Sequence, residues 1–224
     1  MSEWVVDTRG GPCKQCASSY ESLSLHWARS QDCTYPDLSD DHHETIRGCL
    51  LGDGNLDNPN DGPPALRIAS MRRPHIEWIH DQLGWLSRGV TRDDRGAYRL
   101  RTMSHPDLGR YWTWQGGPPT EGWELTRAMA RLWYACDGGL EWPGDSTRPR
   151  ATWTSTDDDK RAALAGALRA QGYDPMEWDR RLALEFEATE RWLDWLGAPT
   201  PGSEYKWALQ RAEYEKRRAT NAGD

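Results

Sequence analysis

Two stretches of this chain read as helices that each end on an aspartate followed by a glycine. The first is ETIRGCLLGDGN, residues 44–55, which contains Asp53, and the second is MARLWYACDGGL, residues 129–140, which contains Asp137. An acid in the last turn of a helix typically costs about 0.3–1 kcal/mol, because the C-terminus is the negative end of the helix dipole. The same unfavourable ending at two places predicts an internal repeat, and a divalent cation would compensate the two acids.

Glycines fix the packing and the ends of both helices. Gly48 and Gly52 are four residues apart, so they share one face of the first helix and permit the close approach of another helix. We expect Gly54 to stop the first helix and Gly138 to stop the second as a left-handed C-cap. The second helix is expected over residues 121–137. Its apolar stripe comprises Leu125, Met129, Leu132, Trp133 and Cys136.

The segments IRGCLLGDG and ARLWYACDG together resemble the two copies of the LAGLIDADG motif of the homing endonucleases. In that family the two motif helices pack side by side at a pseudo-twofold axis, and the acid near the end of each motif binds the catalytic metal ions. The resemblance implies that Asp53 and Asp137 hold Mg²⁺ or Mn²⁺, cations that prefer oxygen ligands. The backbone carbonyls of Gly52 and Cys136 are further candidate ligands. The alternative is that each Asp-Gly pair merely starts a turn.

The remaining elements follow the same order after each motif. In the first half the pattern predicts a loop over 56–64, a strand over 65–71, a helix over 75–86, a hairpin over 87–103 and a helix over 105–114. In the second half it predicts a strand pair over 140–156, a helix over 157–172, a strand over 179–186 and a helix over 189–197. The resemblance implies an α+β fold of two pseudo-symmetric αββαββα half-domains, whose strands form a curved antiparallel saddle with the motif helices at the interface. The predicted domains are residues 37–117 and 118–210, preceded by a zinc-finger-like segment, 1–36, and followed by a charged tail, 211–224, with a frayed end.

Alternation along the strands assigns several arginines to the outer face of the saddle. These are Arg67, Arg99, Arg101 and Arg181. In the strand over 179–186, Ala183 and Glu185 share the outer face, whereas Leu182, Leu184 and Phe186 point inward. The resemblance implies that this outer face lies in the major groove of DNA, so these arginines are candidate DNA contacts. Singly, each also fits a solvated surface residue.

A basic residue from each half commonly lies near the scissile phosphate in this family. In the second half, Lys206 in EYKW matches that position. In the first half the corresponding place reads WQGGPPT, and no lysine occurs between Lys14 and Lys160. Either Arg101 or Arg110 substitutes for it, or the protein nicks one strand, or it binds without cutting.

The segment CKQCASSYESLSLHWARSQDC carries a second candidate metal site. Its Cys13 and Cys16 form a Cys-x2-Cys knuckle, and His26 and Cys33 follow. Zinc prefers four such sulfur and nitrogen ligands in a tetrahedron, although the spacing is shorter than in the common two-Cys, two-His finger. A metal would also supply folding energy that so short a segment cannot obtain from its apolar residues. The alternative is a cysteine-containing loop with a solvent-facing histidine.

Charge and arginine content bear on whether this chain binds nucleic acid. The net charge of −7 and the isoelectric point of about 5.4 disfavour a nucleic-acid partner if only the total matters. However, all but four of the 28 Lys and Arg residues are arginine, which suits bidentate contacts with guanine and phosphate. Such an acidic, lysine-poor composition also suits a high-salt cytoplasm. The lysines are Lys14, Lys160, Lys206 and Lys216.

Cysteine count and hydropathy predict an intracellular protein. The 5 cysteines are odd in number and scattered, which argues against a disulfide framework. The N-terminus MSEWVVDTRG lacks the pattern of a signal peptide, and no apolar run approaches the roughly 18 residues of a membrane helix. We therefore expect a cytoplasmic location and no membrane partner.

Three functions are compatible with these features. The first is a monomeric, metal-dependent, site-specific endonuclease for double-stranded DNA, with internal pseudo-twofold symmetry and a zinc finger that adds DNA contacts. The second is a non-cleaving DNA-binding regulator or RNA-splicing helper of the same fold, which the missing first-half lysine favours. The third is a zinc-finger protein whose second part binds other proteins. Its acidic charge favours that reading, in which Asp53 and Asp137 would lie far apart.

Overall fold

The chain divides into two compact units. The structure is a computed structural model that describes residues 3–58, 62–115, 117–119 and 121–221. Unit 1 comprises Met1–Ile46 and Gly54–Trp112, and unit 2 comprises Arg47–Asp53 and Thr113–Asp224. The predicted frayed end, 222–224, and the middle of the predicted loop, 59–61, lie outside the described residues. Among the described helices, none is long and apolar enough to cross a membrane.

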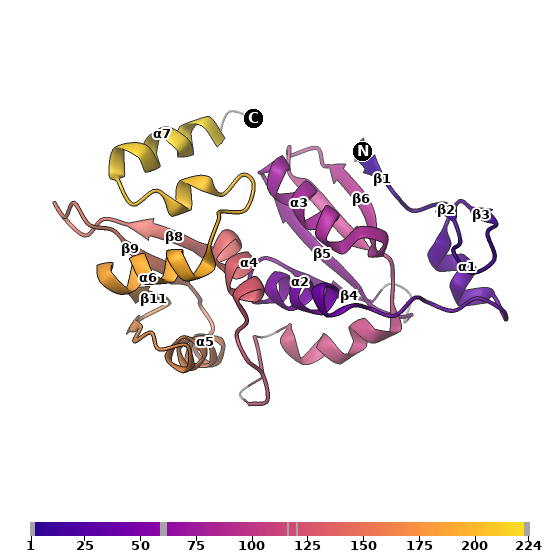
Figure 1. The fold of residues 1–224 in the computed structure, drawn as a ribbon, viewed down its shortest axis with the longest axis horizontal. Coiled ribbons are helices and arrows are strands. Elements are labelled where there is room, and N and C mark those ends of the chain that lie inside the picture. Colours follow the sequence, from indigo (N-terminus) through magenta and orange to yellow (C-terminus); the bar gives the residue numbers. More distant parts are fainter. Residues whose placement is uncertain (1–2, 59–61, 116, 120, 222–224) are drawn as a thin grey trace. The chain divides into compact units, whose positions relative to one another are not determined.

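Unit 1 is built on a five-stranded antiparallel sheet in the order β1-β6-β7-β5-β4 (Figure 1). Its strands are β1 (Glu3–Asp7), β4 (Asn55–Asp57), β5 (Ala65–Ser70), β6 (Ser87–Arg92) and β7 (Tyr98–Thr102). On β5, Leu66 and Ile68 are buried and Arg67 between them is exposed. On β7, Leu100 is buried and Arg99 is exposed. The strand and hairpin predicted for the first half are therefore confirmed.

Helix α3 (Arg73–Leu83) covers one face of this sheet and contacts β5, β6 and β7. Its buried residues follow the spacing of an amphipathic helix, and a 3-10 turn, η2 (Gly84–Leu86), completes the predicted element. The predicted helix at the end of the first half is a 3-10 helix, η3 (Pro106–Trp114). Helix α2 (Asp40–Leu51) begins in unit 1 and ends in unit 2. The buried residues of α3 are His75, Ile76, Ile79 and Leu83.

The N-terminal segment of unit 1 consists of a small hairpin and one short helix. Strands β2 (Gly11–Pro12) and β3 (Ser19–Tyr20) pair antiparallel, and α1 (Leu23–Arg29) begins after Ser22, whose hydroxyl caps it. Strand β1 precedes this hairpin in the chain and pairs with β6, so the polypeptide leaves the sheet of unit 1 before it forms the hairpin.

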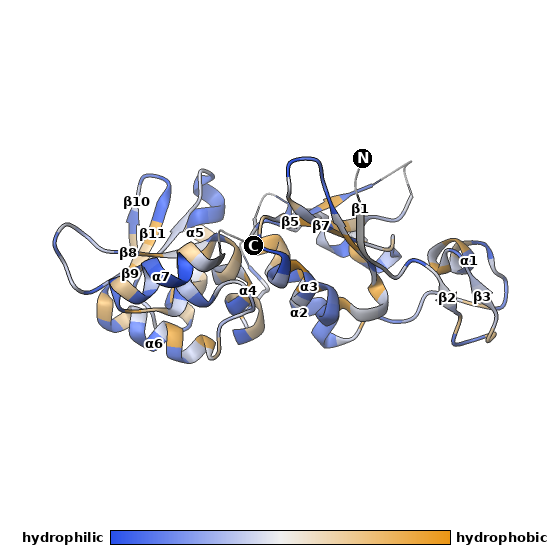
Figure 2. Ribbon diagram, turned by 90° about the horizontal axis from the view of Figure 1, so that it is seen from above, coloured by the Kyte–Doolittle hydropathy of each residue, from blue (hydrophilic) through white to orange (hydrophobic). Residues whose placement is uncertain are grey.

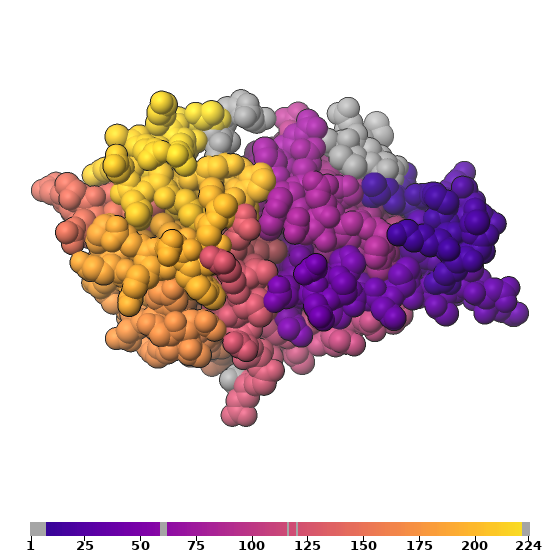
Figure 3. Space-filling view, in the orientation of Figure 1, coloured from indigo at the N-terminus to yellow at the C-terminus, as the bar shows by residue number. Residues whose placement is uncertain are grey.

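Unit 2 is built on a four-stranded antiparallel sheet in the order β10-β11-β9-β8. Its strands are β8 (Gly138–Glu141), β9 (Arg150–Thr154), β10 (Met176–Trp178) and β11 (Arg181–Leu184). Its helices are α4 (Arg127–Asp137), α5 (Asp158–Ala170), α6 (Phe186–Leu196), the 3-10 helix η4 (Glu204–Trp207) and α7 (Arg211–Asn221). Helix α7 packs on η4 and is largely hydrophilic, so the predicted charged tail is a surface helix (Figures 2 and 3).

Aromatic side chains fill the core of unit 2. Trp133 of α4, Trp153 of β9 and Trp192 of α6 are each at most 2% exposed. The rings of Trp133 and Trp153 stack at 5.1 Å, and Trp192 meets Trp153 edge-on at 5.4 Å. Edge-on and stacked aromatic pairs stabilise by about 0.5–1.5 kcal/mol beyond the burial of their area. Some of the 14 tryptophans of the sequence thus serve as core residues.

The two units repeat the same order of elements. Unit 1 runs α2-β4-β5-α3-β6-β7-η3, and unit 2 runs α4-β8-β9-α5-β10-β11-α6. The strand orders also correspond, since β6-β7-β5-β4 matches β10-β11-β9-β8 element by element, with β1 added at one edge of unit 1. The order of elements that the resemblance implies for each half, helix, two strands, helix and two strands, is confirmed.

Several predicted element boundaries are wrong. Helix α4 begins at Arg127, after the capping hydroxyl of Thr126 accepts a hydrogen bond from Met129 N, so residues 121–125 are not helical. Strand β11 ends at Leu184, and Phe186 is the first residue of α6 rather than an inward strand residue. Ala183 shares a face with Arg181 but is fully buried. The short strands β4 and β10 were not predicted.

Candidate functional site

The end of α2 and helix α4 pack closely because α2 carries glycines at the contact. A Cβ on Gly48 would lie 3.0 Å from the Cβ of Leu132. A Cβ on Gly52 would lie 2.4 Å from the Cβ of Cys136. Carbon atoms in contact normally lie about 3.5–4.0 Å apart, so neither position accommodates a side chain without movement. The predicted close approach through Gly48 and Gly52 is confirmed.

This packing brings Asp53 close enough to Asp137 for the charge of one carboxylate to act on the other. Asp53 is exposed in the turn after α2, and Asp137 is the partly buried last residue of α4. Burial, together with the charge of Asp53, raises the pKa of Asp137 to about 7. Two ionised carboxylates this close repel each other, so the pair favours a bound proton or a bound cation.

The backbone after α4 differs from the prediction. Gly138 has φ −74° and ψ 161°, so it continues directly into β8 and is not a left-handed cap. A glycine is required there for another reason, because a Cβ on Gly138 would lie 2.1 Å from the ring of Tyr134. The Tyr134 hydroxyl donates to the carbonyl oxygens of Gly139 at 3.2 Å and Lys206 at 3.0 Å. At the other helix, α2 ends at Leu51, before the predicted stop at Gly54.

A buried lysine compensates the negative end of α4. The ammonium of Lys206, in η4, donates to the carbonyl oxygens of Ala135 at 2.7 Å and Cys136 at 2.9 Å. Its charge and that of Lys160 in α5 oppose the rise in the pKa of Asp137 that burial causes. Lys206 thus lies close enough to Asp137 to act on its charge, while its own hydrogen bonds go to the helix end.

The donor atoms at these helix ends suit a hard divalent cation better than a soft one. Asp53 and Asp137 supply carboxylate oxygens, and the carbonyls of Gly52 and Cys136 belong to the same helix ends. Burial raises the pKa of the Cys136 thiol to about 12, so its sulfur stays protonated and is a poor ligand for zinc. The residues therefore fit Mg²⁺ or Mn²⁺, which take oxygen ligands.

Each arginine predicted to contact DNA forms an ion pair with a nearby acid. Arg67 and Arg101 both pair with Asp57, the latter at 3.2 Å. Arg99 pairs with Asp93 at 2.6 Å. In unit 2, Arg181 pairs with Glu141 at 2.6 Å.

The side chains of these arginines remain partly exposed. The side chains of Arg67, Arg99 and Arg181 are 50%, 56% and 43% exposed, and that of Arg101 is 30% exposed. Arg67 is the register partner of Arg101 on the neighbouring strand, which gathers positive charge on one face of the unit 1 sheet. Two of their acids are less exposed, at 21% for Asp57 and 12% for Asp93, so the value of about 0–1 kcal/mol for fully exposed ion pairs is a lower bound on the cost of exchanging a partner.

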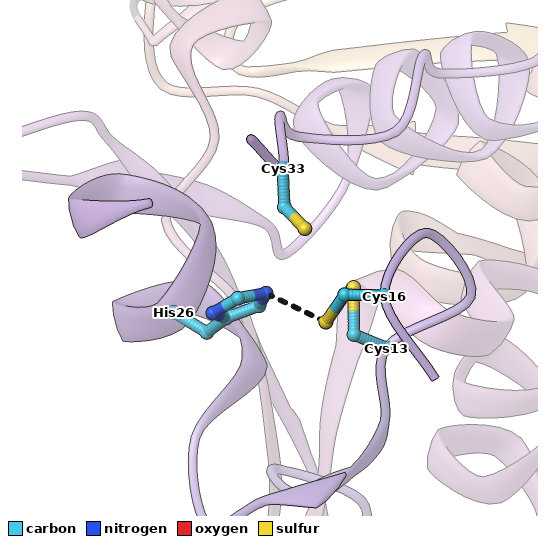
Figure 4. Close-up of side chains that lie close together, drawn as sticks. All are labelled: Cys13, Cys16, His26 and Cys33. Atoms are coloured by element: carbon cyan, nitrogen blue, oxygen red, sulfur yellow. Dashed lines mark hydrogen bonds between the residues drawn. The ribbon is translucent and has the colours of Figure 1, made fainter. Parts of the chain in front are cut away.

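The four predicted zinc ligands lie together in unit 1 (Figure 4). The ligand atoms of Cys13, Cys16, His26 and Cys33 are all within 4.8 Å of one another. Cys13 and Cys33 are buried, His26 is partly buried and Cys16 is exposed. Backbone N–H groups, that of Cys16 first and then that of Gln15, lower the pKa of the Cys13 thiol to about 6.

Some residues that act on the paired acids or on the outer arginines cannot be recognised from the sequence. Lys160 lies in the first turn of α5, within a run of acids that reads as an ordinary capped surface helix, yet its charge acts on Asp137. The acids Asp57 and Glu141, which orient the outer arginines, also carry no sequence signal. They could be found only by assigning the strand register, which places them on the same face as their partners.

Two solved DNA-bound nucleases have a fold similar to that of this chain. The homing endonuclease I-WcaI, solved bound to its DNA recognition sequence, matches with a TM-score of 0.63 and 14% identity over 79% of this chain and 89% of that chain. The meganuclease I-SmaMI, solved bound to uncleavable DNA, matches with a TM-score of 0.51 and 8% identity over 83% of this chain and 99% of that chain. No protein-family model matches the sequence, and no curated protein matches it. At these identities the likeness establishes the fold, and the chain has the LAGLIDADG fold that its paired motifs predict.

Proposed function

We propose that this chain is a metal-dependent endonuclease that binds double-stranded DNA and hydrolyses its phosphodiester bonds at a specific site. The observation that carries the proposal is the close contact of α2 and α4 at Gly52 and Cys136, which places the electrostatically coupled acids Asp53 and Asp137 at neighbouring helix ends. The fold supports it, since I-WcaI shares this fold and is a homing endonuclease with a DNA recognition sequence.

Asp53 and Asp137 would hold Mg²⁺ or Mn²⁺, with the carbonyl oxygens of Gly52 and Cys136 as further candidate ligands. A cation bound there would stabilise the charge that develops on the phosphate and make a bound water more acidic. The chain itself brings the two acids together, because Gly52 allows the contact between α2 and α4. Lys206 holds the end of α4 through its carbonyl oxygens and adds positive charge beside Asp137.

Arg67, Arg99, Arg101 and Arg181 would contact the phosphates or base edges of the duplex. On DNA binding each guanidinium would exchange its carboxylate partner for a phosphate or a guanine edge. The acids would orient the arginines in the free protein and compete with DNA for them. Binding would therefore weaken with salt, as it does whenever cations on a protein release counterions from DNA.

A second candidate is a non-cleaving DNA-binding protein of the same fold. The observation that favours it is the bonding of Lys206, whose ammonium donates to Ala135 and Cys136 carbonyl oxygens. The first half, moreover, has no lysine at all between Lys14 and Lys160. A protein without a basic group beside the scissile phosphate could keep the DNA-binding surface and lose cleavage. The third reading needs Asp53 and Asp137 far apart, whereas the residues before them, Gly52 and Cys136, pack against each other and the two acids are electrostatically coupled.

The test is a cleavage selection that needs no knowledge of the target. Randomised duplex DNA would be incubated with the purified protein and Mg²⁺, and the newly formed ends would be captured and sequenced. We expect ends that share one long sequence, and no such ends with Asp53→Asn or Asp137→Asn. Asp145→Asn is the matched control, because Asp145 is an exposed acid in the β8–β9 loop and should leave cleavage unchanged.

The same selection separates the two candidates. Cleavage that persists undiminished in Asp53→Asn or Asp137→Asn would contradict the assignment of these acids. Sequence-selective binding by the unsubstituted protein without new ends in Mg²⁺ or Mn²⁺ would favour the non-cleaving protein instead. Failure both to bind and to cleave any duplex would exclude both candidates.

A further inference from the structure

A second group of potential metal ligands lies in unit 1, and it differs in chemistry from the paired acids. Three cysteine sulfurs and one imidazole nitrogen converge within 4.8 Å of one another (Figure 4). Within the group, Cys16 Sγ lies 3.6 Å from His26 Nε2. Around a tetrahedral zinc with Zn–S bonds of about 2.3 Å, two sulfurs lie about 3.8 Å apart. The side chains therefore need to move by at most about 1 Å to surround one ion.

Hydrogen bonds in the loop between β2 and β3, and between this loop and the residue after Cys33, hold the ligand-bearing segments together. In the loop between β2 and β3, Ala17 N donates to Cys13 O at 2.8 Å, and Ala17 has φ 60°. Figure 4 shows the side chains of Cys13 and Cys16 next to each other, on the side of this turn that faces His26. The side-chain amide of Gln15 accepts from Thr34 N at 2.8 Å and donates to Thr34 O at 3.0 Å, which ties the residue after Cys33 to the loop.

The orientation of the histidine is also fixed. The ring of Tyr20 stacks on that of His26 with centroids 3.7 Å apart and planes 12° apart. His26 lies on α1, whose first turn is capped by Ser22, so the helix and the stacked ring together aim Nε2 at Cys16. Metal-binding histidines are typically held in this way by neighbouring groups.

The N-terminal segment has little else to hold it together. Among the described residues, the buried members of its cluster are Cys13, Trp27 and Cys33, packed against Met103, and the side chains of Tyr20, Leu23 and Tyr35 cover them only in part. Two of these are thiols, and an apolar core of this size is too small to fold a segment of some 25 residues unaided. All of the cysteines are in the thiol form, so no disulfide supplies the missing energy. A metal ion bound by these side chains would supply it.

From this geometry we propose that Cys13, Cys16, His26 and Cys33 bind one zinc ion that stabilises the N-terminal part of unit 1. Sulfur and imidazole ligands select zinc over Mg²⁺ or Mn²⁺, which take oxygen ligands. Four protein ligands complete the tetrahedron, which is the pattern of structural zinc sites; catalytic sites keep a position for water. The site is independent of the proposed nuclease, and its loss would not by itself remove Asp53 or Asp137.

The ion would also join the segment to the rest of unit 1. Trp27 packs edge-on against Trp85 at 5.5 Å, and Tyr35 meets His105 at 5.2 Å. The imidazole of His105 hydrogen-bonds the carbonyl oxygen of Pro36 at 3.0 Å. These contacts flank the four ligands, so release of the ion would loosen the attachment of the segment to η2 and to the end of β7.

Metal analysis of the intact chain tests the proposal. Protein purified without added metal should contain about one zinc per chain by mass spectrometry of the acid digest, as expected for a four-ligand site. His26→Ala should lose most of this zinc, whereas His26→Cys should keep it as a four-cysteine site. Cys49→Ala is the matched control, because Cys49 is a buried thiol outside the cluster and should retain full zinc content.

Two further measurements keep the test valid if a variant folds poorly. In the unsubstituted protein, Cys16 is exposed and should react at once with a thiol reagent if no metal is bound, but only after a chelator if zinc is bound. Cobalt added to the chelated protein should give the visible absorption of tetrahedral cobalt with thiolate ligands, and His26→Ala should alter it. Zinc well below one per chain, iron in its place, or immediate reaction of Cys16 would overturn the proposal.

Discussion

Replacing Gly52 with alanine should separate the two helix ends that carry the acids. A Cβ at this position would lie 2.4 Å from the Cβ of Cys136 and 3.1 Å from its sulfur. Carbon atoms in contact need about 3.5–4.0 Å, so the backbones of α2 and α4 must move apart by about 1.1–1.6 Å. A change of rotamer cannot relieve this overlap, because both Cβ atoms are fixed to the backbone.

The expected cost follows from two opposing effects. Overpacking of a close contact costs about 1–3 kcal/mol, and replacing glycine with alanine returns about 0.4–1 kcal/mol by restricting the unfolded chain. We therefore expect Gly52→Ala to destabilise the chain by about 1–2 kcal/mol, which lowers the melting temperature by about 2–8 °C for a chain of this size. If the acids act together on a metal, an approximately 1 Å displacement of Asp53 should also reduce cleavage by about 100-fold.

Two other glycines provide controls for this substitution. Gly48→Ala should have a smaller effect, because its Cβ would lie 3.0 Å from Leu132 Cβ. Gly166→Ala, in α5, should stabilise by about 0.5–1 kcal/mol, because no atom lies within 4 Å of its added Cβ. Scanning calorimetry of the three variants should give the highest melting temperature for Gly166→Ala, a lower one for Gly48→Ala and the lowest for Gly52→Ala.

A second substitution should rescue the first. Removing the Cβ of Cys136 with Cys136→Gly in the Gly52→Ala background should recover at least about 1 kcal/mol relative to the sum of the single changes. The reasoning fails if Gly52→Ala is as stable as the unsubstituted protein, or if it behaves like Gly166→Ala.

Three further predictions concern charges. Lys206→Met should destabilise by about 2 kcal/mol, because it leaves buried carbonyls at the end of α4 without their donor, whereas Lys216→Met on the exposed face of α7 should change the melting temperature by less than about 2 °C. Asp137 in the folded chain holds its proton up to about pH 7, against 3.8 for the free side chain, so the folded state binds more protons between these values. This group should make stability fall as pH rises from about 4 to about 7. Urea titrations should show that Asp137→Asn flattens the slope, and an unchanged slope would refute the assignment. Asp57→Asn releases Arg67 and Arg101, so duplex DNA should bind about fivefold more tightly, the effect of about 1 kcal/mol for one charge at short range in water. Equal or weaker binding in fluorescence anisotropy would argue against contacts by these arginines.

Local sequence signals were sufficient for the features that depend on neighbouring residues in the chain. The alternation in β5 and β7 identifies the buried leucines and the exposed arginines, because successive side chains of a strand point to opposite faces. The spacing of Gly48 and Gly52 identifies the contact face of α2, because residues four apart share one side of a helix. The repeated motif also predicts the repeated order of elements, which the matching strand orders confirm.

Boundaries and short strands depended on partners that local patterns do not show. Strands β4 and β10 have three residues each, too few for an alternation to be seen, and each forms by pairing with its neighbour, β5 or β11. Helix α4 starts at Arg127 because the Thr126 hydroxyl caps it, although apolar residues precede that point. Gly138 is needed by the ring of Tyr134 and not by a turn, a contact that exists only once α4 leads directly into β8.

The sequence by itself determined which residues could form the candidate sites. Asp53, Asp137 and the Cys13, Cys16, His26 and Cys33 group all follow from residue type and spacing. Only the tertiary structure decided what surrounds them. The charge of Asp137 depends on burial, Asp53, Lys160 and Lys206, and the hydrogen bonds of Lys206 depend on η4 reaching the end of α4. Electrostatic interactions act through space between residues far apart in the chain. The sequence therefore identifies the acids, whereas the fold determines the charge that they carry.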